Sequence, residues 1–308
     1  MGRRRRGGAP VHGWILLDKP TGMTSTTAVA AVRRLTGAAK AGHGGTLDPL
    51  ATGLLPIALG EATKTLTYVV DGRKSYRFTL RWGVATDSDD SDGQVVAEAP
   101  GRPDRAAVEA VLPRFTGVVE QVPPVFSAIK MAGQRAYDLA RRGEAPEMKP
   151  RSVRIDSLVL LDLDTEHATF AVECGPGTYM RALARDIAQA LGTLGHVVAL
   201  RRVRVGPFTE ADAISLDEVD AVGQSPAVLE HLRSVATALD DIPALALTEP
   251  EAGRLRNGQA VSLLRKVDLQ RIAGFTDGDT VLAMYQDMPV ALTRYSAGEV
   301  KPLRVLNL

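Results

Sequence analysis

Hydrophobic and polar residues alternate along one segment of the chain with the period of a β-strand. From Lys74 to Trp82, tyrosine, phenylalanine, leucine and tryptophan follow at every second position, and serine, arginine and threonine lie between them. This alternation predicts a half-buried strand. Apolar runs bounded by turn residues predict further strands at 13–18, 54–59, 152–161, 168–174 and 196–205.

Helical periodicity occurs in the segments between these strands. Val29, Val32 and Leu35 recur at the spacing of one buried helix face, after an N-cap at position 24 or 25 and before Gly37. Further helical segments are predicted at 103–112, 134–142 and 179–191, and a capping box at 248–251 opens a short helix. The tail from Ala260 has the pattern of short β segments. Together these elements indicate an α+β fold.

Composition narrows the class of protein. A chain of 308 residues with 45% hydrophobic content is long enough to form two domains. No run approaches 18 consecutive apolar residues, and Cys174, the one cysteine, has no partner for an internal disulfide. We therefore expect a cytoplasmic protein with no membrane segment.

Two segments have a superficial likeness to ligand-binding motifs. The aspartate-rich run 87–93 does not fit a calcium loop, because a calcium register would place Ser88 at the first ligand position and Ala99 at the last. The run 60–65 does not fit a phosphate loop, because three residues separate its glycine from its lysine. We expect a polar hairpin loop at 87–93, and neither a metal nor a cofactor.

The net charge is only +1, so binding of nucleic acid would depend on local basic clusters. Arginines and lysines gather in three places: 3–6, 141–154 and 201–204. The alternative for each cluster is an ordinary solvated surface. For the glycine-flanked run at 3–6, we expect part of a disordered basic tail that spans residues 1–11.

The segment from Gly42 to Gly53 places one carboxylate, Asp48, in a constrained loop. Four glycines permit positive φ angles and close approach of a ligand to the backbone, while Pro49 biases Asp48 toward an extended conformation. The apolar run that follows predicts a rigid strand carrying this loop. The pattern indicates a functional aspartate.

The same segment resembles the catalytic-aspartate motif of the TruB family of tRNA pseudouridine synthases, Gly-His-x-Gly-Thr-Leu-Asp-Pro-x-Ala-x-Gly-x-Leu, at every fixed position. Three further blocks follow the family's pattern and order. They are Leu17-Asp18-Lys19-Pro20-x-Gly22-x-Thr24-Ser25, then Lys74-x-Tyr76, and then Gly177-Thr178-Tyr179-x-Arg181 with Leu200-Arg201-Arg202 to Gly206-Pro207-Phe208. One departure is Gly175-Pro176, where the family commonly has serine after the cysteine. We expect it to affect the turn before Tyr179 more than the activity.

The resemblance implies a pseudouridine synthase fold with a mixed, largely antiparallel central sheet flanked by helices. It places a catalytic domain at 12–240, an RNA-clamping insertion at about 121–151, and a small β-rich PUA-like RNA-binding domain at 245–308.

It also implies roles for particular residues. Asp48 is the catalytic carboxylate and Arg181 its charge partner. The flipped uridine is contacted by His43, Tyr76, Tyr179 and Leu200, with His43 filling the space that flipped bases leave. Lys19 and Pro20 support the active-site loop, and no metal takes part.

The implied function is isomerisation of the uridine at position 55, in the T-loop of tRNA, to pseudouridine. The expected partner is the tRNA T-stem-loop, bound by a monomer without a guide RNA. One alternative is a non-catalytic tRNA-binding or tRNA-folding protein on the same scaffold. Another is a guide-RNA-dependent synthase that needs partner proteins.

Overall fold

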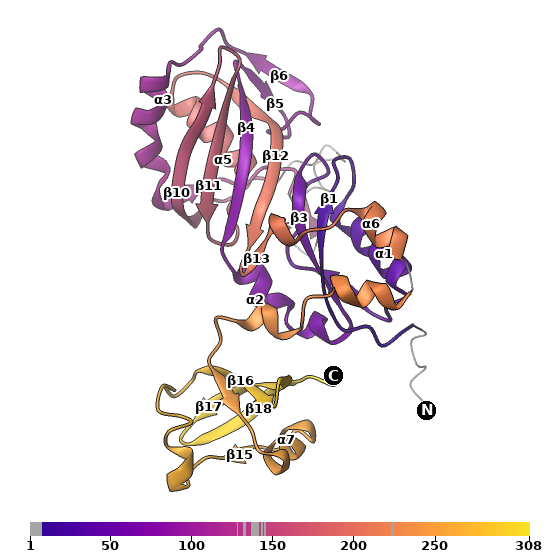
Figure 1. The fold of residues 1–308 in the computed structure, drawn as a ribbon. Coiled ribbons are helices and arrows are strands. Elements are labelled where there is room, and N and C mark those ends of the chain that lie inside the picture. Colours follow the sequence, from indigo (N-terminus) through magenta and orange to yellow (C-terminus); the bar gives the residue numbers. More distant parts are fainter. Residues whose placement is uncertain are drawn as a thin grey trace.

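The computed structural model describes residues 8–127, 129–131, 134–136, 142, 144, 146–222 and 225–308. In these residues, nine strands form one sheet (Figure 1). Its main order is β1 (Gly13–Lys19), β3 (Thr52–Leu59), β12 (Gly195–Val205), β4 (Lys74–Trp82), β11 (His167–Cys174), β10 (Arg151–Leu163) and β7 (Gly117–Gln121). The short strands β2 (Ala41–His43) and β13 (Phe208–Thr209) pair with β3 and β12. Only β12 and β3 run parallel, so the predicted mixed, largely antiparallel sheet is confirmed.

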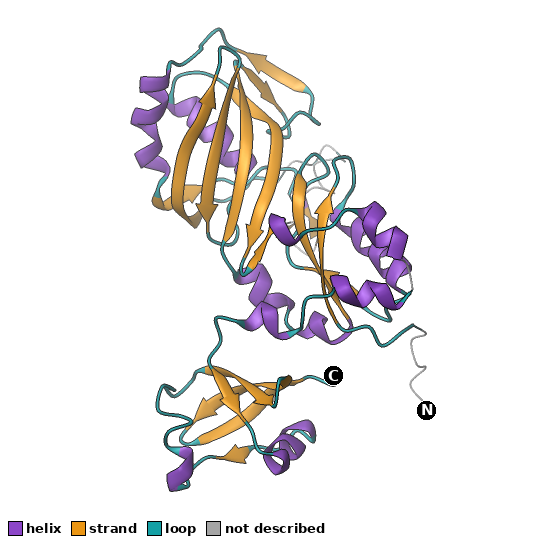
Figure 2. Cartoon of the chain, in the orientation of Figure 1, coloured by secondary structure: helices purple, strands orange, loops and turns teal. Residues whose placement is uncertain are grey.

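Helices cover the sheet in two groups (Figure 2). In one group, α1 (Ser25–Thr36) contacts β3 and α6 (Leu216–Val222) contacts β1. In the other, α5 (Met180–Ala190) contacts β4 and β12, and α3 (Arg105–Val111) contacts β10. Another helix, α2 (Leu66–Asp71), precedes β4. Most of the buried apolar side chains lie in one cluster between the sheet and these helices.

The first helix has the ends that its sequence predicts. The side chain of Thr24 accepts a hydrogen bond from the Thr27 N–H, and Gly37 ends the helix in the left-handed region with φ 65°. The buried stripe differs by one residue, since Ala28 is buried with Val32 and Leu35 while Val29 is only partly buried. A spacing of four and then three residues follows the 3.6-residue period more closely.

The predicted polar hairpin loop lies between β5 (Val84–Thr86) and β6 (Val95–Glu98), which pair antiparallel. The helical prediction for 134–142 is wrong at its start, because β9 (Gln134–Arg135) pairs with β8 (Lys130–Met131). Most of the remaining residues of that prediction lie outside the described residues. So do residues 1–7 of the expected disordered tail, whereas Ala9 forms a β-bridge with Ala38.

The C-terminal residues form a second, five-stranded sheet with its own apolar core. Its order is β14 (Ala244–Ala246), β16 (Thr280–Tyr285), β17 (Met288–Ser296), β18 (Glu299–Val305) and β15 (Val261–Ser262), and α7 (Glu249–Arg256) packs against it. The predicted capping box opens α7. The end of the chain returns to the larger domain, where Leu306 is buried and the Asn307 N–H donates to Glu61.

Candidate active site

The loop that carries Asp48 connects β2 and β3 and is held from the β1 side by Lys19 and Ser25. The ammonium of Lys19, which is fully buried, donates to the carbonyls of Pro20 and Met23, both at 2.8 Å, and of Pro49 at 3.3 Å. The hydroxyl of Ser25 bonds the Leu47 backbone twice, as donor to its carbonyl and acceptor from its N–H. These bonds fix the backbone on both sides of Asp48. Burial lowers the pKa of Lys19 to about 8.

Arg202, on β12, holds the same loop from the other side. It is 1% exposed, and its guanidinium donates to the carbonyls of Leu54 at 2.8 Å and of Gly45 at 3.0 Å. Gly53 has φ 93°, and a Cβ there would lie 2.4 Å from the Arg202 carbonyl oxygen. Only glycine permits this approach of the loop to β12.

Two glycines of the motif are required because a side chain would not fit at their positions. Gly42 and Gly44 do not have positive φ angles, which corrects the expectation for these two positions. A Cβ on Gly44 would lie 2.6 Å from Cγ1 of Val69, and one on Gly42 would lie 2.9 Å from Cδ1 of Leu66. Both therefore let the loop lie directly against α2.

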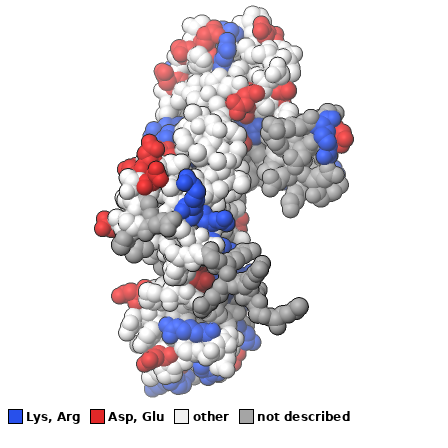
Figure 3. All heavy atoms as spheres, turned by 90° about the vertical axis from the view of Figure 1, so that its right-hand side faces the viewer, with Lys and Arg blue, Asp and Glu red and all other residues white. Residues whose placement is uncertain are grey.

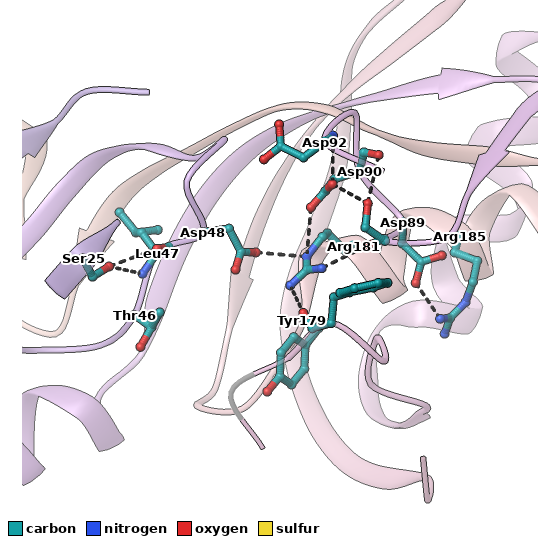
Figure 4. Close-up of polar contacts among 12 residues, drawn as sticks. Ser25, Thr46, Leu47, Asp48, Asp89, Asp90, Asp92, Tyr179, Arg181 and Arg185 are labelled. Atoms are coloured by element: carbon teal, nitrogen blue, oxygen red, sulfur yellow. Dashed lines mark hydrogen bonds and ion pairs between the residues drawn. The ribbon is translucent and has the colours of Figure 1, made fainter. Parts of the chain in front are cut away.

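Asp48 faces Arg181, as Figure 4 shows. The Arg181 Nε lies 3.0 Å from Oδ2 of Asp48, an ion-pair distance, but its N–H makes no hydrogen bond. The other two guanidinium nitrogens of Arg181 donate to the carbonyls of Ser88 at 2.9 Å and Phe126 at 2.8 Å. The structure thus brings together the two residues that the sequence pairs by resemblance, although they lie 133 positions apart in the chain (181 less 48).

A second carboxylate, Asp90, shares Arg181. Its Oδ2 lies 3.5 Å from Arg181 Nε, while its Oδ1 accepts hydrogen bonds from the Ser88 hydroxyl and the Asp92 N–H. Beside it, Asp89 forms an ion pair with Arg185 at 2.8 Å. Two carboxylates of the aspartate-rich loop therefore form ion pairs with two arginines of α5. Among the described residues, no group of three or more metal-ligating side chains is placed to hold a metal ion.

The pKa of Asp48 is raised, because burial disfavours its charge more than Arg181 favours it, and Asp90 adds repulsion. The side chain is 34% exposed, so it remains open to a ligand. A perturbed, accessible carboxyl next to a fixed cation is typical of a reactive group.

Three further residues that the sequence predicts for the site lie on β4, on β12 and at the start of α5. Tyr76 and Leu200 lie on adjacent strands, and burial raises the pKa of Tyr76. Tyr179 is half-buried at the N-cap of α5, two residues before Arg181, and burial raises its pKa too. Leu200 thus lies on the strand that carries Arg202, and Tyr179 at the start of the helix that carries Arg181, while Tyr76 on β4 pairs with Arg202 in the ladder.

His43 lies at the end of β2, opposite Ile57 of β3. Burial is the main cause that lowers its pKa, and Arg202 lowers it further, so the ring is neutral near pH 7. Its Nδ1 is buried without a hydrogen-bond partner. Pro20, next to Lys19, is exposed, and its carbonyl accepts from Lys19.

Pro176 and Gly177 form the turn that departs from the family pattern. Proline followed by glycine with φ 82° fits the two central residues of a type II turn. The Thr178 hydroxyl donates to the Gly175 carbonyl across this turn. The departure thus produces an ordinary tight turn before Tyr179.

Four residues of the site have no assigned role in the sequence analysis. Asp90 and Ser88 lie in the run 87–93, for which the sequence predicts only a polar hairpin loop, and Arg202 and Ser25 lie inside matched blocks. The signal for Arg202 is an arginine inside a predicted strand, because a charge that is buried there requires hydrogen-bond or ion-pair partners. The partners of the other three depend on contacts between distant segments.

Comparison with known proteins agrees with this geometry. Residues 33–180 match the domain described as "TruB family pseudouridylate synthase (N terminal domain)", and residues 181–241 match the "tRNA pseudouridylate synthase B C-terminal domain". The chain belongs to the TruB family. The protein named tRNA pseudouridine synthase B from Rhodospirillum rubrum is 53% identical and aligns over 100% of both chains. Its namesake from Bradyrhizobium diazoefficiens is 54% identical over 99% of this chain and 88% of its own.

Solved structures resemble the TruB-family chain as a whole. A chain from the "Cbf5-Nop10-Gar1 Complex" matches with a TM-score of 0.74 and 26% identity, over 96% of this chain and 85% of that chain. A chain from an "H/ACA RNP bound to a substrate RNA containing 2'-deoxyuridine" matches at 0.73 with 23% identity, over 100% and 92%, and shows the fold alone. The predicted pseudouridine synthase fold is confirmed.

Proposed function

We propose that this chain isomerises the uridine at position 55, in the T-loop of tRNA, to pseudouridine, with Asp48 as the catalytic carboxylate. The observation that carries the proposal is the accessible Asp48 carboxyl facing the buried Arg181, in a chain that is about half identical to proteins named tRNA pseudouridine synthase B. The alternative of a non-catalytic scaffold is not favoured, because the Asp48–Arg181 ion pair and the high identity to proteins named tRNA pseudouridine synthase B both support an enzyme.

The reaction breaks the bond from ribose C1′ to uracil N1 and forms one from C1′ to uracil C5. A single carboxylate suffices, because the leaving uracil stays bound and returns as the nucleophile. Attack on C1′, addition to C6 and removal of a ribose proton all use the same ionised group. Arg181 holds Asp48 in place and favours its charged form against the cost of burial.

The uridine must leave its stack to reach Asp48, at a cost of roughly a few kcal/mol. Tyr76, Tyr179 and Leu200 supply the surface that receives the base. His43 is a neutral ring with an unpaired nitrogen, and we assign it to the space that the flipped base leaves. Lys19 and Pro20 act through the loop backbone.

The RNA surface in this proposal includes the insertion at about 121–151 and a PUA-like domain at 245–308. On the face in Figure 3, lysine and arginine side chains gather at the lower end of the molecule and in a band above it, with acidic residues between. RNA affinity should fall as salt rises, because basic side chains displace phosphate counterions. Filter binding between about 50 and 200 mM salt measures the slope; a flat response contradicts a basic RNA surface.

The proposal includes a monomer that needs no guide RNA and acts on tRNA in the cytoplasm. The related "Cbf5-Nop10-Gar1 Complex" contains further proteins, so the requirement for partners must be tested directly. In the described part of the chain, no helix is long and apolar enough to span a lipid bilayer.

The test is tritium release from an unmodified tRNA transcript that carries 5-tritiated uridine, incubated with the purified chain alone. Release of one equivalent per tRNA, with the product mapped to position 55, is the expected result. Asp48→Ala should abolish release, while Asp162→Ala, an exposed aspartate of β10, should not. Tritium release by Asp48→Ala at the parent's rate would contradict the assignment of Asp48 as the catalytic carboxylate. No release by the parent would favour the non-catalytic or guide-dependent alternative.

A further inference from the structure

Gln121 is buried at the point where the insertion leaves the sheet. It is the last residue of β7, is 3% exposed, and pairs in the ladder with Arg151, where the chain returns. Its side-chain amide forms two hydrogen bonds with the backbone of Tyr179. Nε2 donates to the Tyr179 carbonyl at 3.1 Å, and the Tyr179 N–H donates to Oε1 at 2.8 Å.

This contact accounts for two of the three hydrogen bonds that the described structure gives the Tyr179 backbone; the third is the Leu183 N–H, which donates to the Tyr179 carbonyl at 3.0 Å. It is the N-cap of α5, and its own side chain makes no capping hydrogen bond. The preceding turn is open at Gly177, where a Cβ would meet nothing within 4 Å. A residue at a helix start has non-helical dihedral angles, so its ring direction follows the orientation of its peptide groups. Gln121 bonds the peptide groups on both sides of the Tyr179 Cα.

The residues after Gln121 extend the same contact along α5. The Val122 carbonyl accepts from Arg185 at 2.8 Å, and the Phe126 carbonyl accepts from Arg181 at 2.8 Å. Three α5-side partners, at 179, 181 and 185, are thus held by residues 121–126. We call these contacts the α5 bracket. Among the contributions of residues 121–126, only that of Gln121 comes from a side chain, so a substitution can remove it without altering the backbone.

We propose that Gln121 is a positioning residue, which aims the Tyr179 ring at the uridine site and sets the start of α5 so that Arg181 faces Asp48. The proposal rests on the proposed isomerase function. Replacement by leucine removes both bonds and leaves a buried N–H without its partner, a loss large enough to slow the reaction about tenfold or more. Substrate affinity should change little, because the amide is buried and bonded only to backbone in the described structure.

The experiment measures single-turnover tritium release at saturating tRNA together with tRNA affinity by filter binding. Gln121→Leu should lower the rate constant about tenfold or more and change the dissociation constant less than about twofold. Glu120→Leu is the matched control, since Glu120 precedes Gln121 on β7, is exposed, and bonds the Ser152 hydroxyl instead. The control should keep the parent's rate.

A double-mutant cycle separates positioning from a general structural effect. If Gln121 acts through the Tyr179 ring, Gln121→Leu should slow a Tyr179→Ala enzyme much less than it slows the parent. Full additivity would overturn the proposal, as would an unchanged rate in Gln121→Leu. An affinity loss equal to the rate loss would also overturn it, because Gln121 would then serve RNA binding.

Gln121→Glu covers the case in which the leucine variant does not fold. Its carboxylate keeps the acceptor for the Tyr179 N–H but loses the donor to the Tyr179 carbonyl. A rate constant below that of the parent, with unchanged affinity, is expected; a parent-like rate rejects the proposal. If the parent itself releases no tritium, the proposed function fails, and the absence of release in the variants says nothing against Gln121.

Discussion

Two of the arginine–carboxylate clusters in the described structure combine the same groups with opposite effects on the carboxylate. In the C-terminal domain, Asp268 is fully buried and bonds Arg265 and Arg271, while Glu251 bonds Arg271 and the Thr248 N–H. In the active site, Arg181 is shared by Asp48 and Asp90, and its Nε makes no hydrogen bond to either.

The difference is visible in the direction of the pKa shifts. Hydrogen bonds to Arg265 and Arg271 lower the pKa of Asp268 to about 2. Burial instead raises the pKa of Asp48. A fully paired carboxylate stabilises its domain, whereas a carboxylate with an incomplete shell keeps an oxygen free for substrate and costs stability.

The strongest test of the comparison is Asp48→Asn, which should lower single-turnover tritium release by about 10³-fold or more. Between the unfolded pKa and the raised folded pKa, the folded state holds more protons, so stability falls as pH rises. The variant should therefore melt at a higher temperature than the parent at pH 7, and the difference should vanish in acid. A lower melting temperature at pH 7 would contradict the comparison.

Arg181→Met should reduce the rate by about 10²-fold or more, because it removes the cation that orients Asp48. It also leaves Asp90, which is 4% exposed, without its charge partner, and should cost about 3–5 kcal/mol of unfolding free energy. Urea unfolding and tritium release measure the two effects. Arg105→Met, at an exposed ion pair on α3, is the control and should change neither.

Arg202→Met should slow the reaction about tenfold, because the carbonyls of Gly45 and Leu54 lose their donor and the Asp48 loop loosens. The matched control is Arg204→Met, two residues along β12, where the arginine is exposed and bonds only the Gly206 carbonyl in the described structure. Equal rates in the two variants would show that the hydrogen bonds from Arg202 to the Asp48 loop do not matter for the reaction.

Asp268→Asn should leave the isomerisation rate unchanged and lower the melting temperature of the C-terminal domain by about 5 °C at pH 7. A lowered folded pKa gives stability that is present above the unfolded pKa and lost as pH falls toward about 2. The difference between parent and variant should thus shrink in acid, measured by calorimetry, with the exposed Asp287→Asn as control. A difference that grows in acid would reverse the assignment.

The sequence by itself determined several of the main elements and the central carboxylate. The alternation at 74–82 gave β4 within its bounds, the caps at Thr24 and Gly37 gave the ends of α1, and the loop glycines with Pro49 marked Asp48. Local patterns fix these features because neighbouring residues set the dihedral angles and the buried face of each element. The pairing of Asp48 with Arg181 was available only through resemblance to a family.

Tertiary structure decided which distant groups form ion pairs and hydrogen bonds with one another. No period or spacing connects Arg181 with Asp90, Arg202 with Gly45, or Gln121 with Tyr179, since each pair meets only when segments far apart in the chain become neighbours. The pKa of Asp48 depends on the same packing, because burial outweighs its cation and both arise from surrounding segments. Burial and pairing are properties of the assembled fold, so a residue's reactivity is settled there.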